Sequence, residues 1–406
     1  MLRSIELFAG AGGLGIGASL AGFRHEAVLE WDRDACDTIR ENQDHAVFPV
    51  AEWPRIEPVD ISKFDFTTIP DDIDLLSGGP PCQPWSLGGK HRAHRDERNL
   101  FPDVIRAVRE LKPKAIVIEN VKGLTRESFS RYFEYIKLQL RYPEIAQKAA
   151  EGWVDHLARL EREHRAKKHD GLWYRVADKL LNASDYGVPQ RRERVFIVGF
   201  RSDLEVAWSF PKPSHSLDSL LWDQWVSAEY WERHRVSRKA RPAIPGGLWN
   251  RVSRLKHMLF KPADAPWATV RDAISDLPDP ERDARASEIP NHRFNPGARR
   301  YPGHTGSPLD EPAKTLKAGV HGVPGGENMV ALPDGHLRYL TVRESARLQT
   351  FPDDYVFHGS WTESMRQLGN AVPVRLAQAV TTEVRKHLQS SARRARNGQD
   401  QGRAAV

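Results

Sequence analysis

The chain has 406 residues, 40% of them hydrophobic and 28% charged, and no apolar run is long enough to span a bilayer, which excludes a membrane-spanning protein. Its 60 lysines and arginines exceed its 54 acidic residues and give a net charge of +6, which favours a polyanionic partner over an acidic one. Its two cysteines, Cys36 and Cys82, are too few for a disulfide framework or a cysteine-based zinc site.

Short apolar runs alternate with helix-like stretches through the first 200 residues. The expected strands are 5–8, 27–29, 73–76, 115–118 and 195–198. Such continuous apolar runs predict strands buried on both faces, as in a parallel α/β sheet. In such a sheet ligands bind outside the carboxyl ends of the strands. No signal-peptide pattern precedes the first strand, so we expect a cytoplasmic protein.

The composition changes along the chain and predicts a division into domains. We expect residues 1–200 to form the larger domain, with a charged, solvated helical insertion at about 126–171. Tryptophans interleaved with arginines and lysines, and frequent proline and glycine, predict a loop-rich basic domain over 201–361. Residues 362–390 are expected to return to the larger domain, and 391–406 to form a disordered basic tail.

A glycine-rich turn follows the first expected strand. Gly10, Gly12 and Gly15 satisfy the pattern G-x-G-x-x-G, and Glu30 follows at a distance suited to binding ribose hydroxyls. This predicts a ligand that contains adenosine. S-adenosylmethionine carries the same adenosine as NAD, so the turn alone is also compatible with a dehydrogenase.

Cys82 lies in a segment that reads GGPPCQPWS, residues 78–86, after the strand at 73–76. Glycines and prolines on both sides predict a rigid, exposed loop at the ligand-binding edge of the sheet. A structural cysteine prefers the apolar interior of an element, as we expect for Cys36. Cys82 is therefore the candidate nucleophile, which acts as a thiolate.

Two further groups of charged residues stand near strand ends. Glu119 follows the strand at 115–118 and is interpreted either as a surface acid or as a carboxyl group aimed into the cleft of Cys82. Gln190, Arg192 and Arg194 alternate in sequence before the strand at 195–198 and would share one face. A cationic pair on that face could bind phosphate or stabilise a thiolate.

Seven blocks of sequence resemble, in order, those of the DNA cytosine-5 methyltransferases of bacterial restriction–modification systems. They are FAGAGG from Phe8, EWD from Glu30, PPCQ from Pro80, ENV from Glu119, QRRER from Gln190, RE and RLQTFP between Arg343 and Pro352, and QLGNAVP from Gln367. The resemblance covers nearly the whole chain. One departure is Glu6, where the family usually has aspartate before Leu-Phe.

The resemblance implies an α/β fold: a Rossmann-like sheet of the S-adenosylmethionine-dependent methyltransferases, with a smaller, irregular target-recognition domain. It implies methyl transfer to C5 of a flipped-out cytosine in a specific duplex DNA sequence, through a covalent adduct of Cys82 with C6. Glu119, protonated and with a raised pKa, would bind N3 and the exocyclic amine. Arg192 and Arg194 would offset negative charge.

The same resemblance implies binding residues. Glu30 would bind the ribose, Trp31 would stack near the adenine and Asp60 would contact its amino group. The full cofactor set is Phe8, Ala9, Gly10, Gly12, Gly13, Glu30, Trp31, Asp60, Ile61, Gly79, Pro81, Leu100, Asn370, Ala371 and Val372. The implied DNA contacts are Gln83, Ser86, Arg98, Thr315 and Leu316. No metal ion is expected. The expected enzyme is a monomer, associated with the nucleoid, and a cognate restriction endonuclease would act on the same site without direct contact.

Three alternatives remain at the level of sequence. A tRNA cytosine-5 methyltransferase would share the blocks around Cys82 and Glu119, but that family normally carries Cys-Phe-Thr in a shorter second domain, and no cysteine follows Cys82. A non-catalytic DNA-binding homologue could lose Cys82, Glu119 or the glycines, and all are present. A dehydrogenase does not explain the later blocks. The choice of DNA over RNA depends on the second domain.

Overall fold

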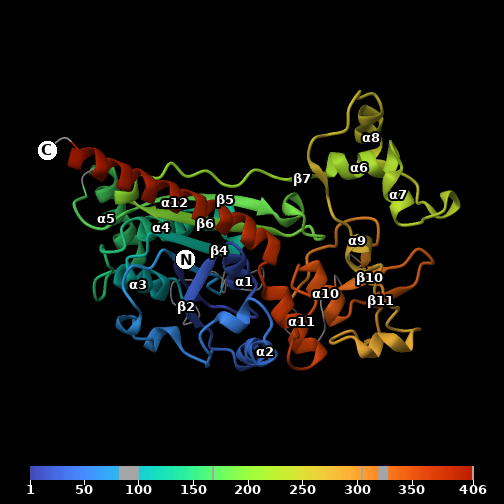
Figure 1. The fold of residues 1–406 in the computed structure, drawn as a ribbon, viewed down its shortest axis with the longest axis horizontal. Helices are drawn as coiled ribbons and strands as arrows, with labels where there is room; N and C mark the ends of the chain where they lie inside the picture. The colour runs from blue at the N-terminus through green and yellow to red at the C-terminus, as the bar shows by residue number, and fades with distance from the viewer. Residues whose placement is uncertain (82–99, 167–168, 303–304, 319–327, 405–406) are drawn as a thin grey trace. The chain divides into compact units, whose positions relative to one another are not determined.

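The computed structural model describes residues 1–81, 100–166, 169–302, 305–318 and 328–404 (Figure 1). The chain forms two compact units. Unit 1 contains Met1–Leu181, Glu193–Pro211 and Ala377–Val406, and unit 2 contains Asn182–Arg192 and Lys212–Leu376. None of the helices in the described part of the chain has the length and apolarity needed to cross a membrane.

Unit 1 is built around a six-stranded sheet of order β2-β1-β3-β4-β6-β5. The strands are β1 (Leu2–Leu7), β2 (Phe23–Leu29), β3 (Leu75–Gly78), β4 (Ala115–Val121), β5 (Tyr174–Asn182) and β6 (Glu193–Arg201). Strands β2, β1, β3 and β4 run parallel, so their carboxyl ends meet at one edge. Strand β6 runs antiparallel to β4, which corrects the expectation of an all-parallel sheet. All five expected strands are present, and β5 is additional.

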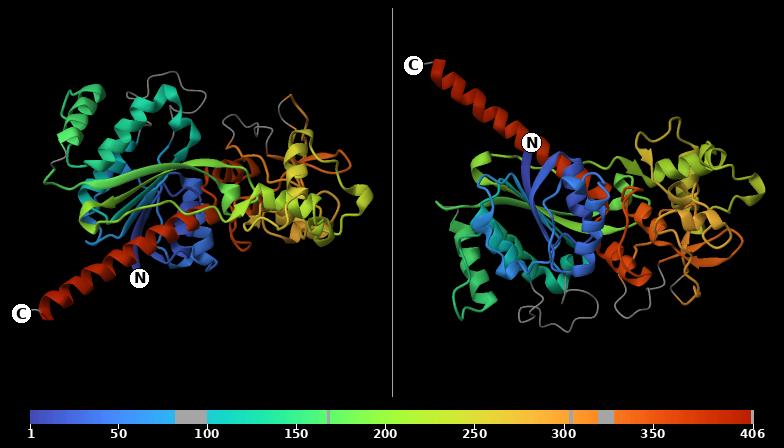
Figure 2. Two further views of the ribbon diagram at one scale, coloured as in Figure 1. Left: turned by 90° about the horizontal axis from the view of Figure 1, so that it is seen from above. Right: turned by 60° about the horizontal axis from the view of Figure 1, so that its bottom comes forward.

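Helices cover both faces of this sheet (Figure 2). They are α1 (Gly13–Leu20), α2 (Arg33–Asp44), α3 (Phe101–Leu111), α4 (Ser130–Arg141), α5 (Trp153–Ala166) and α12 (Val374–Ala404). Helices α3 and α4 share an apolar core with Ile5, Leu7 and Ile118 of the strands. Helix α12 contacts α1 and the residue that follows it: the Thr381 hydroxyl donates a hydrogen bond to the carbonyl of Gly17 at 3.3 Å, and Arg385 donates one to the carbonyl of Ala21 at 2.9 Å.

The region 126–171, expected as a solvated insertion, is helical but is partly core. Tyr132, Ile136 and Leu140 of α4 are buried in the cluster that includes the sheet. Their spacing of four residues places them on one face of the helix, whereas Glu134 between them is exposed and Lys137 is half-buried. The expectation of a solvated segment is therefore wrong for α4, because high charge concealed an amphipathic helix.

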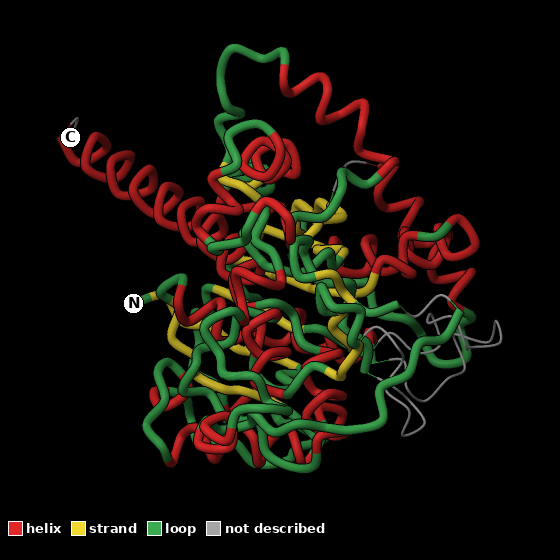
Figure 3. Tube along the Cα trace, turned by 90° about the vertical axis from the view of Figure 1, so that its right-hand side faces the viewer, coloured by secondary structure: helices red, strands yellow, loops and turns green. Residues whose placement is uncertain are grey.

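The C-terminal segment is helical where a disordered tail was expected from residue 391. Helix α12 runs without a break to Ala404 (Figures 2 and 3). Val380, Val384 and Leu388 recur at the helical spacing and are buried. The Ser391 hydroxyl donates a hydrogen bond to the carbonyl of Leu204 at 2.8 Å, so packing against unit 1 continues at least this far.

Unit 2 consists of short elements joined by long loops (Figure 3). They are β7 (His215–Ser216), α6 (Leu217–Trp225), α7 (Glu229–Arg233), α8 (Trp249–Lys256), β8 (Ala265–Pro266), α9 (Val270–Ile274), β9 (Ser307–Pro308), β10 (Met329–Ala331), β11 (Leu337–Tyr339), α10 (Val342–Leu348) and α11 (Trp361–Asn370). Its limits differ from the expected 201–361: the unit includes 182–192 and continues to Leu376. Helix α11 therefore belongs to unit 2 and not to the returning segment.

Candidate active site

The glycine-rich turn leaves the carboxyl end of β1 in a conformation that favours glycine. Gly10 and Gly12 have φ angles of 52° and 87°, and Phe8, unusually for a side-chain-bearing residue, has a φ of 56°. A Cβ atom added at Gly10 would have no neighbour within 4 Å, so the space above this backbone is open. The turn can therefore accept a ligand in close approach to its backbone.

Glu30 stands beside this turn at the end of β2 and is only 8% exposed. Its carboxylate accepts hydrogen bonds from the backbone N–H groups of Gly10 at 2.7 Å, and of Trp31 and Asp32 at 2.8 Å each. Burial raises the pKa of Glu30, and these three hydrogen bonds oppose that shift. The carboxylate is held in one orientation next to the open turn.

Two other predicted cofactor residues, Trp31 and Asp60, lie in backbone segments that adjoin Glu30. The N–H of Val59 donates to the carbonyl of Glu30 at 2.7 Å, which places the segment of Asp60 alongside it. The Asp60 side chain accepts bonds from the N–H and hydroxyl of Ser62, and the hydrogen bonds from Ser62 lower its pKa. Trp31 is 72% exposed, which leaves its ring available for stacking. Ile61 is buried and Leu100 caps α3.

Glu119 emerges at the carboxyl end of β4 and is 6% exposed, which rejects the interpretation as a surface acid. Its Oε1 lies 2.8 Å from Nε of Arg194 on β6. In the antiparallel pair Arg194 lies opposite Val121, two residues from Glu119 on the same face, so the two side chains meet diagonally. A Cβ atom added at Gly79 would lie 3.1 Å from Oε2 of Glu119, so glycine leaves room for the carboxylate beside β3.

Asn120 fixes the start of the loop that leads to Cys82. Its amide donates to the carbonyl of Pro80 at 3.1 Å, and its side-chain oxygen accepts from the N–H of Val121 at 2.9 Å. The sequence analysis cited Asn120 only within a motif. The signal that could have revealed its role is a buried amide next to Glu119, because such a group requires partners.

The candidate nucleophile Cys82 lies outside the described residues, as do Gln83, Ser86 and Arg98. The preceding Pro81 is exposed at the end of the described segment. Cys36, in contrast, is fully buried in α2, with its thiol 3.6 Å from the carbonyl of Glu30. Burial raises the pKa of Cys36 to about 12, so its thiol is not available as a thiolate.

Arg192 belongs to unit 2 and is fully buried there. Its guanidinium donates hydrogen bonds to the carbonyls of Leu316 at 2.9 Å, Gly369 at 2.6 Å and Ala371 at 2.9 Å. The two arginines, which were expected to act together on one face, therefore have different partners. Arg192 ties the backbone of unit 2 together, whereas Arg194 pairs with Glu119 in unit 1.

Thr315 and Leu316 lie next to the segment 190–192 in unit 2. The Thr315 hydroxyl donates to the carbonyl of Arg191 at 2.7 Å, and the N–H of Leu316 donates to Oε1 of Gln190 at 3.0 Å. The Leu316 side chain is 1% exposed and packs in an apolar cluster. The side chain of Leu316 is therefore part of the core, and its expected contact with DNA stays a prediction.

The block around Asn370 reaches very close to another backbone segment within unit 2. A Cβ atom added at Gly369 would lie 2.3 Å from the nitrogen of Ala318, so only glycine fits there. Asn370 itself is exposed, Ala371 is half-buried and Val372 is buried. The sequence alone could not show that Gly369 serves a backbone contact.

Comparison with known proteins agrees with this arrangement. A sequence model of the family "C-5 cytosine-specific DNA methylase" matches residues 2–142 and 151–386. The Type II methyltransferase M.PspPI of Psychrobacter sp. (strain TA137) is 32% identical over 93% of this chain and 77% of its own length. The Type II methyltransferase M.NgoMIV of Neisseria gonorrhoeae is 32% identical over 95% of this chain and 97% of its own length.

The fold is also found among solved structures. The S. pombe Dnmt2 methyltransferase superposes with a TM-score of 0.54 at 17% identity, covering 96% of this chain and 99% of that one. That likeness concerns the fold. The match of the family over most of the chain decides membership: this protein belongs to the C-5 cytosine-specific DNA methylases.

Proposed function

We propose that this protein transfers the methyl group of S-adenosylmethionine to C5 of a flipped-out cytosine in a specific duplex DNA sequence. The observation that carries the proposal is the buried pair of Glu119 and Arg194 at the end of β4, beside the strand end that leads to Cys82. The Type II methyltransferases among its relatives support a role in protecting DNA within a restriction–modification system. We further propose that it acts as a monomer in the cytoplasm, on the site of a cognate endonuclease that it does not contact.

The chemistry begins with a ring carbon that is a poor nucleophile. In the proposal the Cys82 thiolate attacks C6 of the extruded base, and the electron pair of the C5–C6 bond moves toward the C4–N3 side of the ring and makes C5 nucleophilic. When bound, S-adenosylmethionine supplies the electrophilic methyl group for C5. Loss of the C5 proton to a base and departure of Cys82 restore the double bond and the free thiolate.

Glu119 and Arg194 would have different roles in stabilising the charge that develops on the ring. Glu119, carrying a proton, donates to N3 and accepts from the exocyclic amine, which stabilises the charge that develops on the ring. Nε of Arg194 lies 2.8 Å from Oε1 of Glu119, so its positive charge stands beside the site of the reacting ring. In the proposal Arg194 offsets the negative charge of the adduct.

The residues at the ends of β1 and β2 fit S-adenosylmethionine. A carboxylate fixed by three backbone N–H groups, Glu30, can accept hydrogen bonds from ribose hydroxyls, and the exposed Trp31 ring can stack on adenine. The open backbone at Gly10 would receive the methionine portion, with Phe8, Ala9, Gly12 and Gly13 around it. Asp60 would bind the adenine amino group.

Arg192 and Thr315 are given other roles in this proposal. We assign Arg192 to positioning, since its hydrogen bonds hold the backbone carbonyls of Leu316 and Ala371 in unit 2. Thr315, which is half-buried, remains a candidate DNA contact. Asn370 to Val372 remain candidates for the cofactor pocket by resemblance.

Expression of the protein in cells, followed by bisulfite sequencing of their DNA, tests the function. We expect 5-methylcytosine at one sequence context with the wild type, none with Cys82→Ser, and wild-type levels with Cys36→Ala, which removes the buried thiol only. Full methylation by Cys82→Ser would reject the nucleophile. Methylation of tRNA in place of DNA would favour a tRNA methyltransferase.

A further inference from the structure

Unit 2 presents an apolar tip to solvent. The segment between α8 and β8 carries Met258, Leu259 and Phe260, which are 42%, 90% and 80% exposed. Single exposed hydrophobic residues are common on proteins, but a contiguous exposed patch marks an interaction site. In Figure 1 this segment forms an arch above α6. We therefore consider the tip, residues 258–260, as an interaction site.

The tip stands on a well-anchored base. Val252 and Leu255 of α8 are fully buried against Leu221 of α6. On the far side of the tip, Nζ of Lys261 lies 2.6 Å from Oδ1 of Asp223, whose side chain is 4% exposed. Both ends of the segment thus contact α6, so the tip is exposed although the segment that carries it is packed on the protein.

Ion pairs add to this anchor on α8. Nε of Arg251 pairs with Asp218, and Nη2 of Arg254 lies 3.1 Å from Oδ2 of the same carboxylate. Both arginines are exposed, so their remaining N–H groups stay accessible. The helix that leads to the tip therefore carries its positive charges in a fixed position on the surface.

The stretch of sequence that contains the tip carries an excess of basic residues, although Asp218 and Asp223 of α6 pair with Arg251, Arg254 and Lys261. Between residues 229 and 262 the only acids are Glu229 and Glu232. The basic residues of the same stretch are Arg233, Arg235, Arg238, Lys239, Arg241, Arg251, Arg254, Lys256 and Lys261. A second copy of this surface would meet it with like charge, which disfavours self-association. A polyanion with apolar faces between its charges fits both the charge and the tip, and duplex DNA is such a ligand.

We propose that the Met258–Phe260 tip contacts the DNA duplex, with the apolar side chains against base or sugar faces and Lys256 and Arg254 on the flanking phosphates. The inference rests on the proposed DNA-modifying function and deepens it. Apolar side chains that wedge against a base step weaken its stacking, and proteins use them to deform DNA. The tip would therefore contribute binding energy that depends little on salt, next to lysines whose contribution depends on it strongly.

The test compares full-length variants for binding to a duplex that carries the methylated site. Leu259→Ser/Phe260→Ser should weaken binding about tenfold or more with an unchanged salt dependence, whereas Lys256→Ala should reduce the slope of log affinity against log salt by about one. The matched control is Val154→Ser, which replaces an apolar residue of α5 that is 41% exposed; this variant should bind as the wild type does. Wild-type affinity in the double variant would overturn the proposal.

A photo-crosslinking residue at position 259 provides a measurement that does not depend on variant stability. Illumination should link the protein to the duplex. Linkage to a second protein copy, or none to DNA while methylation proceeds, would overturn the tip assignment and leave the proposed function intact. A wild-type protein that does not methylate DNA at all would instead reject the function.

Discussion

Glu6 is a buried carboxyl group on β1, at the position where the sequence departs from the family pattern. It is 1% exposed and accepts a hydrogen bond from the hydroxyl of Ser77 on β3. Burial raises its pKa to about 8; the bond from Ser77 opposes this shift and the negative charge of Glu119 adds to it. The carboxyl group is therefore mostly protonated at neutral pH.

This shift predicts a pH dependence of stability. In the unfolded chain Glu6 loses its proton near 4.5, whereas in the folded chain it keeps it up to about 8. The unfolded state binds fewer protons between these values, so the contribution of Glu6 to stability declines as the pH rises through this window. Glu6→Gln, which cannot ionise, should gain stability relative to the wild type by on the order of 1 kcal/mol per pH unit.

Chemical denaturation of both proteins at several values between about pH 5 and pH 8 measures this difference. A constant difference for Glu6→Gln across the range would contradict the assignment of Glu6 as a protonated group.

Gly369 gives a second prediction at the residue scale. An added methyl group would lie within 2.5 Å of three backbone atoms of Lys317 and Ala318, which cannot move as a flexible side chain could. Gly369→Ala should therefore destabilise unit 2 by roughly 1–3 kcal/mol, as overpacking does. Gly335→Ala is the contrasting variant, because Gly335 has a φ of 86° and no atom within 4 Å of the added carbon, so it introduces backbone strain without a collision. Equal thermal shifts in the two variants would argue against the close approach.

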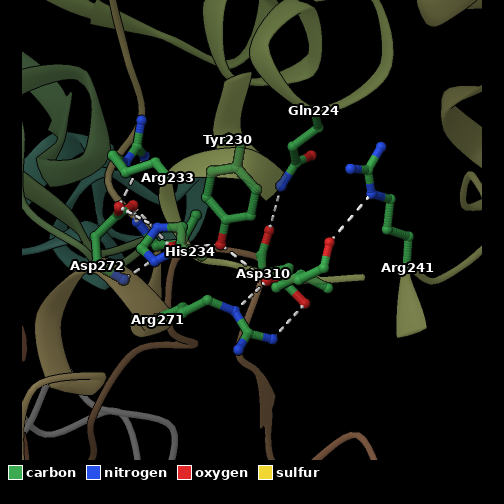
Figure 4. Close-up of polar contacts among 10 residues, drawn as sticks. Gln224, Tyr230, Arg233, His234, Arg241, Arg271, Asp272 and Asp310 are labelled. Carbon is green, nitrogen blue, oxygen red and sulfur yellow. Dashed lines mark hydrogen bonds and ion pairs between the residues drawn. The ribbon is translucent and has the colours of Figure 1, made fainter. Parts of the chain in front are cut away.

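At the scale of elements, a polar network joins the helices of unit 2 (Figure 4). The Asp310 carboxylate accepts from Nε of Arg271 at 2.6 Å and from the Tyr230 hydroxyl at 2.9 Å. The backbone carbonyl of Asp310 accepts from Gln224 of α6 at 2.7 Å. Asp310 thus links α6, α7 and α9, which lack a continuous sheet to hold them.

Replacing Asp310 should weaken this linkage. Asp310→Asn keeps the shape but leaves the guanidinium of Arg271 without its ionic partner, and the two side chains are each 16% exposed. We expect a loss of roughly 1–3 kcal/mol in the free energy of unfolding. Asp276→Asn removes an ion pair of Arg347 whose acid is 68% exposed, and should cost less than about 1 kcal/mol. Comparable losses in both variants would contradict a structural role for the network.

The elements of the sheet were largely predictable because buried parallel strands leave continuous apolar runs. Strand β5 was missed because it contains Arg175, Asp178 and Lys179 and is largely exposed, so it has no such run. Helix α4 was taken as solvated because its charge hid the buried face. In unit 2 the short strands depend on partners far along the chain, which local pattern does not reveal.

At the scale of the whole molecule, the positions of the site residues in unit 1 were easier to predict from the sequence than their interaction partners. The segment of Asp60 lies beside Glu30. Glu119 and Arg194 meet because β6 runs antiparallel to β4, which places the amino end of β6 at the carboxyl end of β4. Alternation in sequence suggested that Arg192 and Arg194 act together. The chain instead passes from unit 2 to unit 1 between these two residues. A local alternation of residue types does not reveal such a boundary between units.

The central claim is that Cys82 attacks C6 of a cytosine in DNA. A duplex with 5-fluorocytosine at the methylated position tests it, because fluorine cannot leave as a proton does and the adduct persists. With S-adenosylmethionine present, we predict a denaturant-stable protein–DNA complex whose linked peptide, by mass spectrometry, contains Cys82, and none with Cys82→Ser. Methylation of the normal duplex without a trapped complex, or a linkage at another residue, would contradict the account.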